Sequence, residues 1–460
     1  MPRLKVAIVG AGTGGLAAAY DLARAGCAVT VFEAEAQVGG LAGGFKEPRW
    51  EWSLERFYHH WFASDADILR LIEELGWTHR VRFHWPVTAA FHGGGFHALD
   101  APPSLRVPGA PWLDRMPGAL FLSRILHLSR FPALRKPEAL RAGLAGLYLV
   151  LTRDWRRLER VTAHEWLSRH MGRRCYEVLW GPLLVSKFGA CAREVNMAWF
   201  WARIKARTPR LGTFEGGFQA LLDALAERIQ REGVFVRLNA PVERIDSHRD
   251  RGLGLSFRGG EGTFDHVLFT SAPGRLARLT PTLPPEYRAR LLNLKAMGAV
   301  VLVLALRHRL SEEGTYWHNL PKRAGFPFLV LVEHTSFVSP EFFDGEHIVY
   351  CGDYLDPAHE HFTLSQDELL ARFLPALSRI NPAFKPEWLR ASWLFRTPYA
   401  QPIPFVHHSA AIPEIKTPVP GLWLACMDQV YPCDRTTNFA VRLGRRAASR
   451  ILRESGTARA

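Results

Sequence analysis

A strand, a glycine-rich turn, a helix and a second strand follow one another at the start of the chain. Lys5 to Val9 is an apolar run of strand length that leads into Gly10-Ala-Gly-Thr-Gly-Gly15. Residues 16–25 are good helix formers, Gly26 is a typical helix stop, and Ala28 to Phe32 form the next apolar run. This order predicts a βαβ unit, in which one helix connects two parallel strands.

The glycines of the turn have separate expected tasks. Gly10 makes the tight turn, Gly12 lets the backbone approach a pyrophosphate, and Gly15 brings the helix close to the strand. The start of the helix, with Thr13 and Gly14, would face the phosphates, because its free N–H groups and its dipole favour negative charge. The turn therefore predicts a dinucleotide site.

An acidic residue ends the second predicted strand. Glu33 lies where a carboxylate can accept hydrogen bonds from both ribose hydroxyls and disfavour a 2′-phosphate, and Ala34 follows it. The βαβ unit alone does not separate a nicotinamide from a flavin dinucleotide. A second glycine turn, Val38-Gly39-Gly40-Leu41, comes soon after and predicts a further backbone approach to the cofactor, which a simple nicotinamide dehydrogenase does not require.

These motifs resemble the superfamily of flavin-dependent amine oxidases, phytoene desaturases and protoporphyrinogen oxidases, and the likeness covers most of the chain. The resemblance implies FAD as the cofactor. The matching signature positions are Gly10, Gly12, Gly15, Glu33, Gly39 and Gly40. Gln37 and Leu41 stand where arginines are often found, and the strand-like run 300–306 lacks the lysine of many amine oxidases. These departures favour branches of the superfamily other than the amine oxidases.

Two later stretches resemble the remaining FAD-binding segments of that superfamily. The resemblance implies that the backbone of Val242 reads the adenine and that Asp428 binds the ribityl chain, with Asp434 as the substitute. It also implies that a helix beginning at Asn438-Phe439-Ala440 points its N-terminus at the flavin, where the dipole would stabilise negative charge on the reduced ring.

The separated FAD segments predict an α/β fold with a discontinuous Rossmann-like FAD-binding domain. We expect this domain to contain residues 1–86, 206–275 and 410–460. Residues 87–205 are expected to form a helical cap, and residues 276–409 a mixed sheet that binds the substrate. Strands are predicted at 297–306, 328–332, 347–354 and 392–399.

Catalytic residues are hard to identify because a flavin performs the electron transfer itself. The resemblance places His60 near the flavin ring, where a neutral histidine can exchange a proton, although a packing role is the alternative. Tyr399 and Tyr431 resemble aromatic residues that flank the substrate, and each could instead close a core. Lys187 and Arg203 could hold a carboxylate or phosphate, but a surface role is the favoured interpretation.

The chain carries a formal net charge of +14, and half of the excess falls within residues 105–160, where arginines alternate with large apolar residues. That composition suits peripheral contact with an anionic membrane, although an ordinary cap with solvated arginines is the favoured interpretation. No nucleic-acid recognition module is evident. The six scattered cysteines predict neither a metal site nor a disulfide framework. A cytoplasmic location is expected, with peripheral contact at the inner face of the membrane as the open alternative.

The expected function is an FAD-dependent oxidoreductase that dehydrogenates a large, lipophilic small-molecule substrate by hydride transfer to flavin. A flavin-dependent isomerase or mutase that uses no net redox chemistry, an amine oxidase, and a flavin-binding protein without turnover are the alternatives. The identity of the substrate, the electron acceptor and the oligomeric state stay open.

Overall fold

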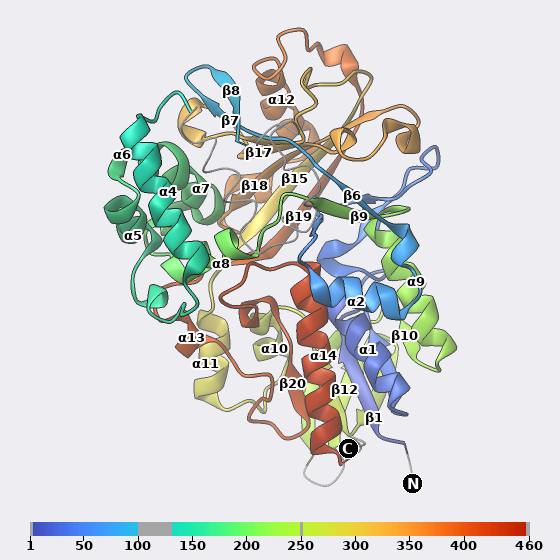
Figure 1. Ribbon diagram of the computed structural model, residues 1–460. Helices are drawn as coiled ribbons and strands as arrows, with labels where there is room; N and C mark the ends of the chain where they lie inside the picture. The colour runs from blue at the N-terminus through green and yellow to red at the C-terminus, as the bar shows by residue number, and fades with distance from the viewer. Residues whose placement is uncertain (1–2, 100–130, 249–251, 457–460) are drawn as a thin grey trace.

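The computed structural model describes residues 3–99, 131–248 and 252–456, and its fold is of the expected α/β class. Its nucleotide-binding unit is built on a five-stranded sheet in which every pair of neighbours is parallel, in the order β10-β2-β1-β14-β20 (Figure 1). The strands are β1 (Lys5–Val9), β2 (Ala28–Phe32), β10 (Phe235–Arg237), β14 (His266–Phe269) and β20 (Leu422–Leu424).

The continuous apolar sequence of β1 follows from the burial of both of its faces. Val6 and Ile8 contact the helices on one side, whereas Ala7 and Val9 contact a different core on the other. The helical layer consists of α1 (Thr13–Arg24), α2 (Ala66–Glu74), α9 (Gly217–Arg231) and α14 (Thr437–Glu454). Helices α1 and α14 lie side by side along the sheet, so segments from the two ends of the chain share one layer (Figure 1).

The opposite face of the parallel sheet is covered by a three-stranded antiparallel sheet and two helices. These elements are β11 (Val242–His248), β12 (Gly252–Phe257), β13 (Gly260–Phe264), α10 (Pro273–Leu279) and α11 (Pro285–Asn293). Leu276, Tyr287 and Leu291 of the two helices pack into the same core as β11 and β12. Residues 276–293 therefore belong with the nucleotide unit, and the expected boundary at residue 276 lies too early.

A mixed seven-stranded sheet forms the second unit, at the top of Figure 1, in the order β19-β15-β18-β17-β16-β7-β8. Its strands are β7 (Thr88–His92), β8 (Gly95–Ala98), β15 (Ala296–Leu306), β16 (Trp317–Asn319), β17 (Val330–Glu333), β18 (His347–Leu355) and β19 (Leu389–Pro402), with α12 (Gln366–Leu377) packed against it. The hairpin β7–β8 was expected in the helical cap. It joins the sheet because β7 pairs in parallel with β16.

The cap is a separate helical layer, at the left of Figure 1. It consists of α4 (Lys136–Leu151), α5 (Ala163–His170), α6 (Arg173–Cys175), α7 (Gly181–Phe188) and α8 (Met197–Ala206), which share one core. Residues 105–130 of the basic, apolar stretch lie outside the described residues, so the structure addresses that stretch only from Phe131 onward.

Short elements connect the three units. They are β3 (Gly44–Phe45), β4 (Leu54–Glu55), β5 (Trp61–Phe62), β6 (Val81–His84), β9 (Leu211–Phe214) and α13 (His408–Ala411). Strand β9 pairs with both β5 and β6, which ties the segment after the cap to the N-terminal part of the chain.

Candidate functional site

The glycine turn after β1 has the geometry that its sequence predicts. Gly10 has a φ of +108°, a backbone conformation that side-chain-bearing residues rarely adopt. A Cβ atom on Gly15 would lie 2.1 Å from the carbonyl oxygen of Gly10, so only glycine lets α1 begin this close to the strand. The turn therefore presents the N-terminus of α1, with Thr13 and Gly14, at the end of β1.

The two predicted glycine turns face each other. Gly12 and Gly39 form an isolated parallel bridge, and the Gly39 N–H donates to the Ala11 carbonyl at 2.9 Å. Gly12 is not crowded, since the nearest atom to an added Cβ would be the Gly39 oxygen at 3.9 Å, an ordinary contact distance. Gly40 is exposed next to it, and Leu41 follows half-buried. The backbone thus forms an open cradle of the kind that a pyrophosphate requires.

Glu33 and the chain before Val242 lie side by side next to this cradle. The Glu33 carboxylate accepts from the Ala11 N–H at 2.8 Å and from the Glu35 N–H at 3.0 Å. The Ala240 N–H donates to the Glu33 carbonyl at 2.8 Å, which brings the chain before Val242 beside the end of β2. Ala34 is exposed at this end. The structure therefore brings together the residues that were predicted to bind the ribose and adenine.

Gln219 fixes the second glycine turn, and the sequence analysis did not identify this role. Its side-chain oxygen accepts from the Gly44 N–H at 2.9 Å, while its side-chain nitrogen donates to the Val38 carbonyl at 3.1 Å. The signal was available, because Gln219 follows directly on the Gly216-Gly217-Phe218 turn that opens α9.

The start of α14 lies against the start of α1. A Cβ on Gly14 would lie 3.0 Å from the Ala440 carbonyl oxygen, so the two helices touch at this point. The Asn438 side chain does not face the groove as a free ligand, because its oxygen accepts from the Asp67 N–H at 2.7 Å and the Ile68 N–H at 3.1 Å. Asn438 thereby holds the start of α2. Phe439 packs under the Arg442 guanidinium at 4.8 Å.

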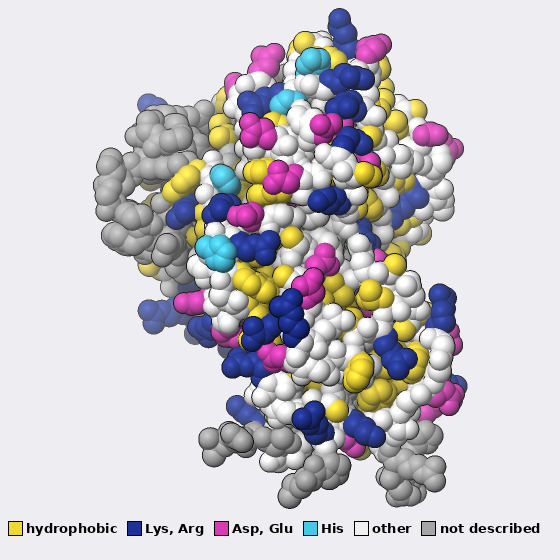
Figure 2. Space-filling model, turned by 90° about the vertical axis from the view of Figure 1, so that its right-hand side faces the viewer, with side chains coloured by type: hydrophobic (Ala, Val, Ile, Leu, Met, Phe, Trp, Pro, Cys, Tyr) yellow, Lys and Arg dark blue, Asp and Glu magenta, His cyan; other side chains and the backbone are white. Residues whose placement is uncertain are grey.

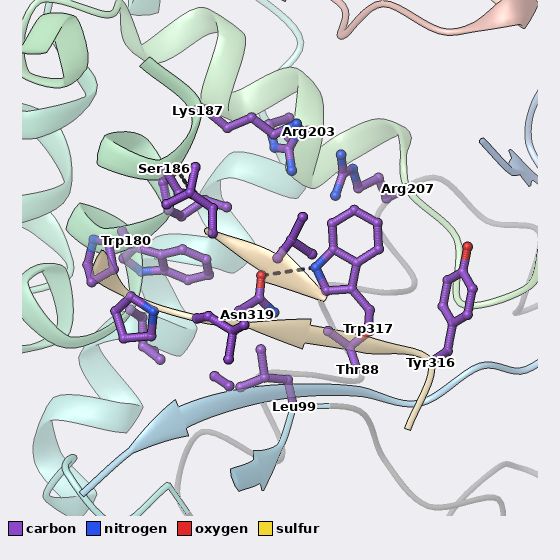
Figure 3. Close-up of a pocket in the computed structure, with 18 of the residues that line it drawn as sticks. Thr88, Leu99, Trp180, Ser186, Lys187, Arg203, Arg207, Tyr316, Trp317 and Asn319 are labelled. Carbon is purple, nitrogen blue, oxygen red and sulfur yellow. Dashed lines mark hydrogen bonds between the residues drawn. The ribbon is translucent and has the colours of Figure 1, made fainter. Parts of the chain in front are cut away.

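A cavity of about 250 Å³ lies between the cap and the seven-stranded sheet. Aromatic and aliphatic side chains form most of its wall, and three cationic side chains gather at one end, as Figure 3 shows. The lining within the described part of the chain includes no Asp or Glu. Labelled residues of the wall in Figure 3 include Thr88, Leu99, Trp180, Tyr316, Trp317 and Asn319.

The sequence profile described as flavin containing amine oxidoreductase matches residues 13–452 of this chain. The chain belongs to the flavin-containing amine oxidoreductase family. FAD is accordingly its cofactor. The carboxylate of Glu33, bonded to the Ala11 N–H, and the start of α14, in contact with Gly14, both lie against the glycine turn, an arrangement that suits an extended dinucleotide.

Two curated relatives of this family member are carotenoid enzymes. A carotenoid phi-ring synthase from Streptomyces griseus is 26% identical over 310 residues, which cover 63% of this chain and 57% of that protein. A hydroxyneurosporene desaturase from Cereibacter sphaeroides is 28% identical over 311 residues, which cover 59% and 57%. The chain thus spans less than two thirds of the length of these relatives.

Solved structures share the fold of the family member over nearly its whole length. The structure of a candidate protoporphyrinogen oxidase from Exiguobacterium sp. 255-15 superposes with a TM-score of 0.74 at 20% identity, covering 99% of this chain and 100% of that one. A reduced UDP-galactopyranose mutase superposes with a TM-score of 0.72 at 14% identity, covering 99% and 96%. At these identities the likeness shows the fold.

His60 lines the cavity, in contrast to the two predicted catalytic tyrosines. Its Nδ1 lies 3.3 Å from the Tyr316 hydroxyl, and its ring packs edge-on against Phe62 and Trp317. Burial, reinforced by the positive charge of Arg207, lowers the pKa of His60 to about 3. The imidazole is therefore neutral at physiological pH and serves as a hydrogen-bonding group, and its catalytic role stays a prediction.

Tyr399 and Tyr431 lie outside the described lining of the cavity. The Tyr399 hydroxyl donates a short hydrogen bond to the carboxylate of Asp428, and burial raises the pKa of both groups. Tyr431 packs into the core of the cap, with ring contacts to Trp155 at 5.3 Å and His408 at 5.0 Å. Asp428 is thus engaged by Tyr399, and its predicted contact with the ribityl chain stays untested.

Lys187 and Arg203 do not have the surface role that was the favoured prediction for them. Both line the cavity, and the side chain of Arg203 is only 9% exposed, so a solvated surface position is wrong for it. Arg203 and Arg207 both pair with Asp434, the substitute that was considered for the ribityl contact. The signal was the setting of two cationic residues among Trp180, Trp199 and Trp201.

Proposed function

We propose that this protein is an FAD-dependent oxidoreductase that dehydrogenates a large, mainly apolar substrate. The observation that carries the proposal is the aromatic and aliphatic cavity, whose cationic end adjoins the N-terminus of α14. Two contacts fix that neighbourhood. The Trp61 indole N–H donates to the Thr437 hydroxyl at 2.8 Å, and Arg203 of the cavity pairs with Asp434, three residues before Thr437.

Bound FAD supplies the hydride acceptor, so the protein has to orient a C–H bond and exclude water. The wall residues Phe91, Leu99 and Trp180 suit an apolar body that is held by contact rather than by hydrogen bonds. Neutral His60, with Tyr316, forms the polar part of the wall near Trp317 and can orient a polar atom of the substrate. The substrate would lose a hydride from one carbon to FAD and a proton from the neighbouring carbon to solvent, and the electron pair left by the proton would form the double bond.

The charge of the cavity argues against an amine as the substrate. Lys187, Arg203 and Arg207 line it, and its described wall includes no carboxylate. A protonated amine would be repelled, because like charges in a site of low dielectric interact strongly. The carotenoid relatives and the apolar wall support a carbon–carbon bond as the site of reaction.

A flavin-dependent isomerase or mutase is the second candidate function. The cationic end of the cavity would suit a phosphorylated substrate whose bonds are rearranged without net oxidation. The two candidates differ in whether the flavin ends in a changed redox state, so one anaerobic experiment separates them.

The test is anaerobic incubation of the FAD-loaded protein with a carotenoid, a porphyrinogen and a primary amine in turn. Dehydrogenation predicts that an apolar substrate bleaches the visible flavin absorbance and loses two hydrogens by mass spectrometry, while the amine does neither. Turnover by reduced protein with no change in substrate mass would select the isomerase. Bleaching by the amine alone would contradict the proposal.

We further propose that the cap associates with the surface of an anionic membrane. Helix α4 buries its small residues and turns large apolar ones outward, among them Leu140 (66% exposed), Leu144 (62%) and Leu151 (69%). Exposed basic residues lie on this helix and in the segment that follows it: Lys136, Arg141, Arg153, Arg156, Arg157 and Arg160. An apolar face with basic edges is typical of helices that lie in the membrane interface.

The face of the molecule shown in Figure 2 has a different distribution of charge. On the face shown in Figure 2, basic and acidic side chains are interspersed. Among the described residues, no helix is both long and apolar enough to cross a bilayer. The proposal is therefore one of contact with the membrane surface through α4.

A further inference from the structure

Three cationic side chains enter the cavity from the same side. Lys187 projects from α7, Arg203 from α8 and Arg207 from the residue that follows α8, and Figure 3 shows them together above Trp317 and Asn319. The remainder of the wall is largely apolar, with no acidic side chain among its described residues. The cavity is thus amphipathic, with the cations gathered together next to aromatic rings and a largely apolar wall elsewhere.

One carboxylate is shared by two of these cations. Asp434 accepts a short hydrogen bond from Arg203, and its Oδ2 lies 3.3 Å from the Arg207 guanidinium. Burial opposes ionisation of Asp434, but the charges of Arg203, Lys187, Arg435 and Arg207 outweigh it and hold its pKa below the usual range. Asp434 is therefore fully charged at neutral pH and can balance only one of its neighbours.

Lys187 is not balanced by a carboxylate. Its ammonium lies 4.1 Å from the centroid of the Tyr354 ring, and it makes no hydrogen bond within the described part of the chain. Burial lowers the pKa of Lys187 to about 8, and Arg435 and Arg203 add to that effect. The ammonium is charged at neutral pH, with its three donors directed to no described protein acceptor.

Arg435 also contacts Tyr354 and adds a fourth positive charge. Its guanidinium donates to the Tyr354 hydroxyl at 2.6 Å. Burial alone would raise the pKa of Tyr354, but Arg435 and Lys187 outweigh it and lower the pKa to about 7. Tyr354 can thus carry part of a negative charge, yet four cations and one carboxylate still leave this end positive. Buried charge without a counterion is costly, which makes a bound anion the natural complement.

We propose that the substrate carries an anionic group, a carboxylate or a phosphate ester, that binds between Lys187, Arg203 and Arg207. The apolar body of the substrate would then lie along the aromatic wall of the same cavity. Guanidinium and ammonium groups bind both anions by charge-assisted hydrogen bonds, so the geometry selects the charge and leaves the choice between them to the experiment. This inference rests on the proposed function only in taking the cavity as the substrate site.

The test uses the FAD-loaded protein and four probes that share one tail: dodecyl phosphate, dodecanoate, dodecanol and dodecyltrimethylammonium. Binding is measured by titration calorimetry. The two anions are expected to bind at least about tenfold more tightly than dodecanol, since hydrogen bonds to charged groups are the stronger ones. The cationic probe is expected to bind most weakly. The ratio of dodecyl phosphate to dodecanoate affinity identifies the anion that the site prefers.

Variants locate the binding to these side chains. Lys187→Gln and Arg207→Gln should each weaken binding of the two anions about tenfold and leave dodecanol unchanged. Lys205→Gln is the matched control, because Lys205 lies on α8 between the two arginines but donates to the Thr152 carbonyl outside the cavity. The FAD content of each variant, read from flavin absorbance, checks that the fold and cofactor are intact.

Three results would overturn the inference. The first is equal affinity for the anionic and neutral probes. The second is that Lys187→Gln loses affinity for dodecanol as well as for the two anions. The third is that Lys187→Gln binds the anions as the wild type does but has a shifted flavin midpoint potential. The last result would assign the charge to the flavin. If the cavity binds anions selectively but no substrate reduces the flavin, the proposed function is contradicted and this inference stands. If a neutral substrate reduces the flavin and the cavity shows no preference for anions, the inference is contradicted and the proposed function stands.

Discussion

Gly14 of α1 and Gly444 of α14 touch backbone to backbone. A Cβ on Gly444 would lie 2.1 Å from the Gly14 carbonyl oxygen. The first and last helices of the nucleotide unit therefore cross at a point where neither has room for a side chain. This contact sets the distance between the glycine turn that ends at Gly15 and the N-terminus of α14, and so the width of the FAD groove.

Gly444→Ala should destabilise the protein and weaken FAD binding. The added methyl group must push the helices apart, and overpacking of this kind costs about 1–3 kcal/mol. Thermal unfolding monitored by flavin fluorescence measures both effects. Gly274→Ala is the matched control in another helix, because its Cβ would have only the Arg278 guanidinium at 3.9 Å nearby. A Gly444→Ala protein as stable as Gly274→Ala would contradict the close crossing.

Glu33→Gln should weaken FAD binding by about ten- to a hundredfold, because hydrogen bonds to a charged acceptor contribute about 1.5–3 kcal/mol. Titration of the FAD-free protein with FAD gives the dissociation constants. Glu35→Gln serves as the control, since Glu35 is exposed and pairs with Arg56. If both variants bind FAD like the wild type, Glu33 is not a ribose ligand.

Asp434→Asn should change stability and anion affinity in opposite directions. Removal of the carboxylate leaves Arg203 and Arg207 without their counterion, and breaking a buried pair typically costs about 3–5 kcal/mol. The same change makes the cavity more positive, so dodecyl phosphate should bind more tightly. Thermal unfolding and calorimetry on one preparation measure the two quantities. A fall in both stability and affinity for dodecyl phosphate would show that Asp434 maintains the geometry of the site and does not compete with the anion for the two arginines.

Glu333 should make stability depend on pH. Its buried carboxylate accepts from the Leu310 N–H at 2.9 Å and the Ser311 N–H at 2.7 Å, yet burial outweighs these bonds and raises its pKa to about 7. In the unfolded state the carboxyl loses its proton near pH 4.5, whereas in the folded state it keeps the proton up to about pH 7. Between these two pH values the free energy of unfolding therefore falls as the pH rises.

The stability of the wild type relative to Glu333→Gln should accordingly fall by up to about 3 kcal/mol as the pH rises through that window, and stay level above it. Thermal unfolding of both proteins at a series of pH values measures the difference. Taking this difference cancels the contribution of the other buried acids, Glu55 and Asp65, whose pKa values burial also raises to about 7. A difference that is independent of pH would contradict the assignment.

The membrane proposal predicts flotation with vesicles that contain phosphatidylserine, and weaker flotation at high salt, because salt screens the attraction. The double variant Leu144→Glu/Leu151→Glu should remain in the soluble fraction. Leu292→Glu is the control, since Leu292 is 48% exposed on α11. Failure of the wild type to float with anionic vesicles would remove the proposal.

The nucleotide unit could be predicted from the sequence because its constraints are local. The φ of Gly10 and the contact between Gly15 and Gly10 act within six residues, and a glycine pattern followed by an acid records them directly. The α/β class, the discontinuous FAD-binding unit and the cofactor follow from the same pattern. The predicted strand at 297–306 is likewise confirmed as β15, because a fully buried strand is apolar throughout.

The cationic end of the cavity could not be predicted because it depends on distant partners. Arg203 pairs with Asp434, 231 positions away. The tryptophans that flank Arg203 in the sequence hint at a buried setting, but they do not reveal this partner. The hairpin β7–β8 was misplaced for the same reason, since its pairing with β16 is decided more than two hundred residues later. The hydrophobic periodicity of a segment does not indicate which distant segment it pairs with.

The measurement that tests the central claim most directly is the cofactor content of the purified protein. Three separated stretches, which carry Gly12, Val242 and Asn438, should hold one FAD between them. The protein should be yellow. Denaturation should release one FAD per chain, as quantified by chromatography. The refolded or FAD-stripped protein should bind added FAD again. A colourless protein that does not bind added FAD would contradict the account.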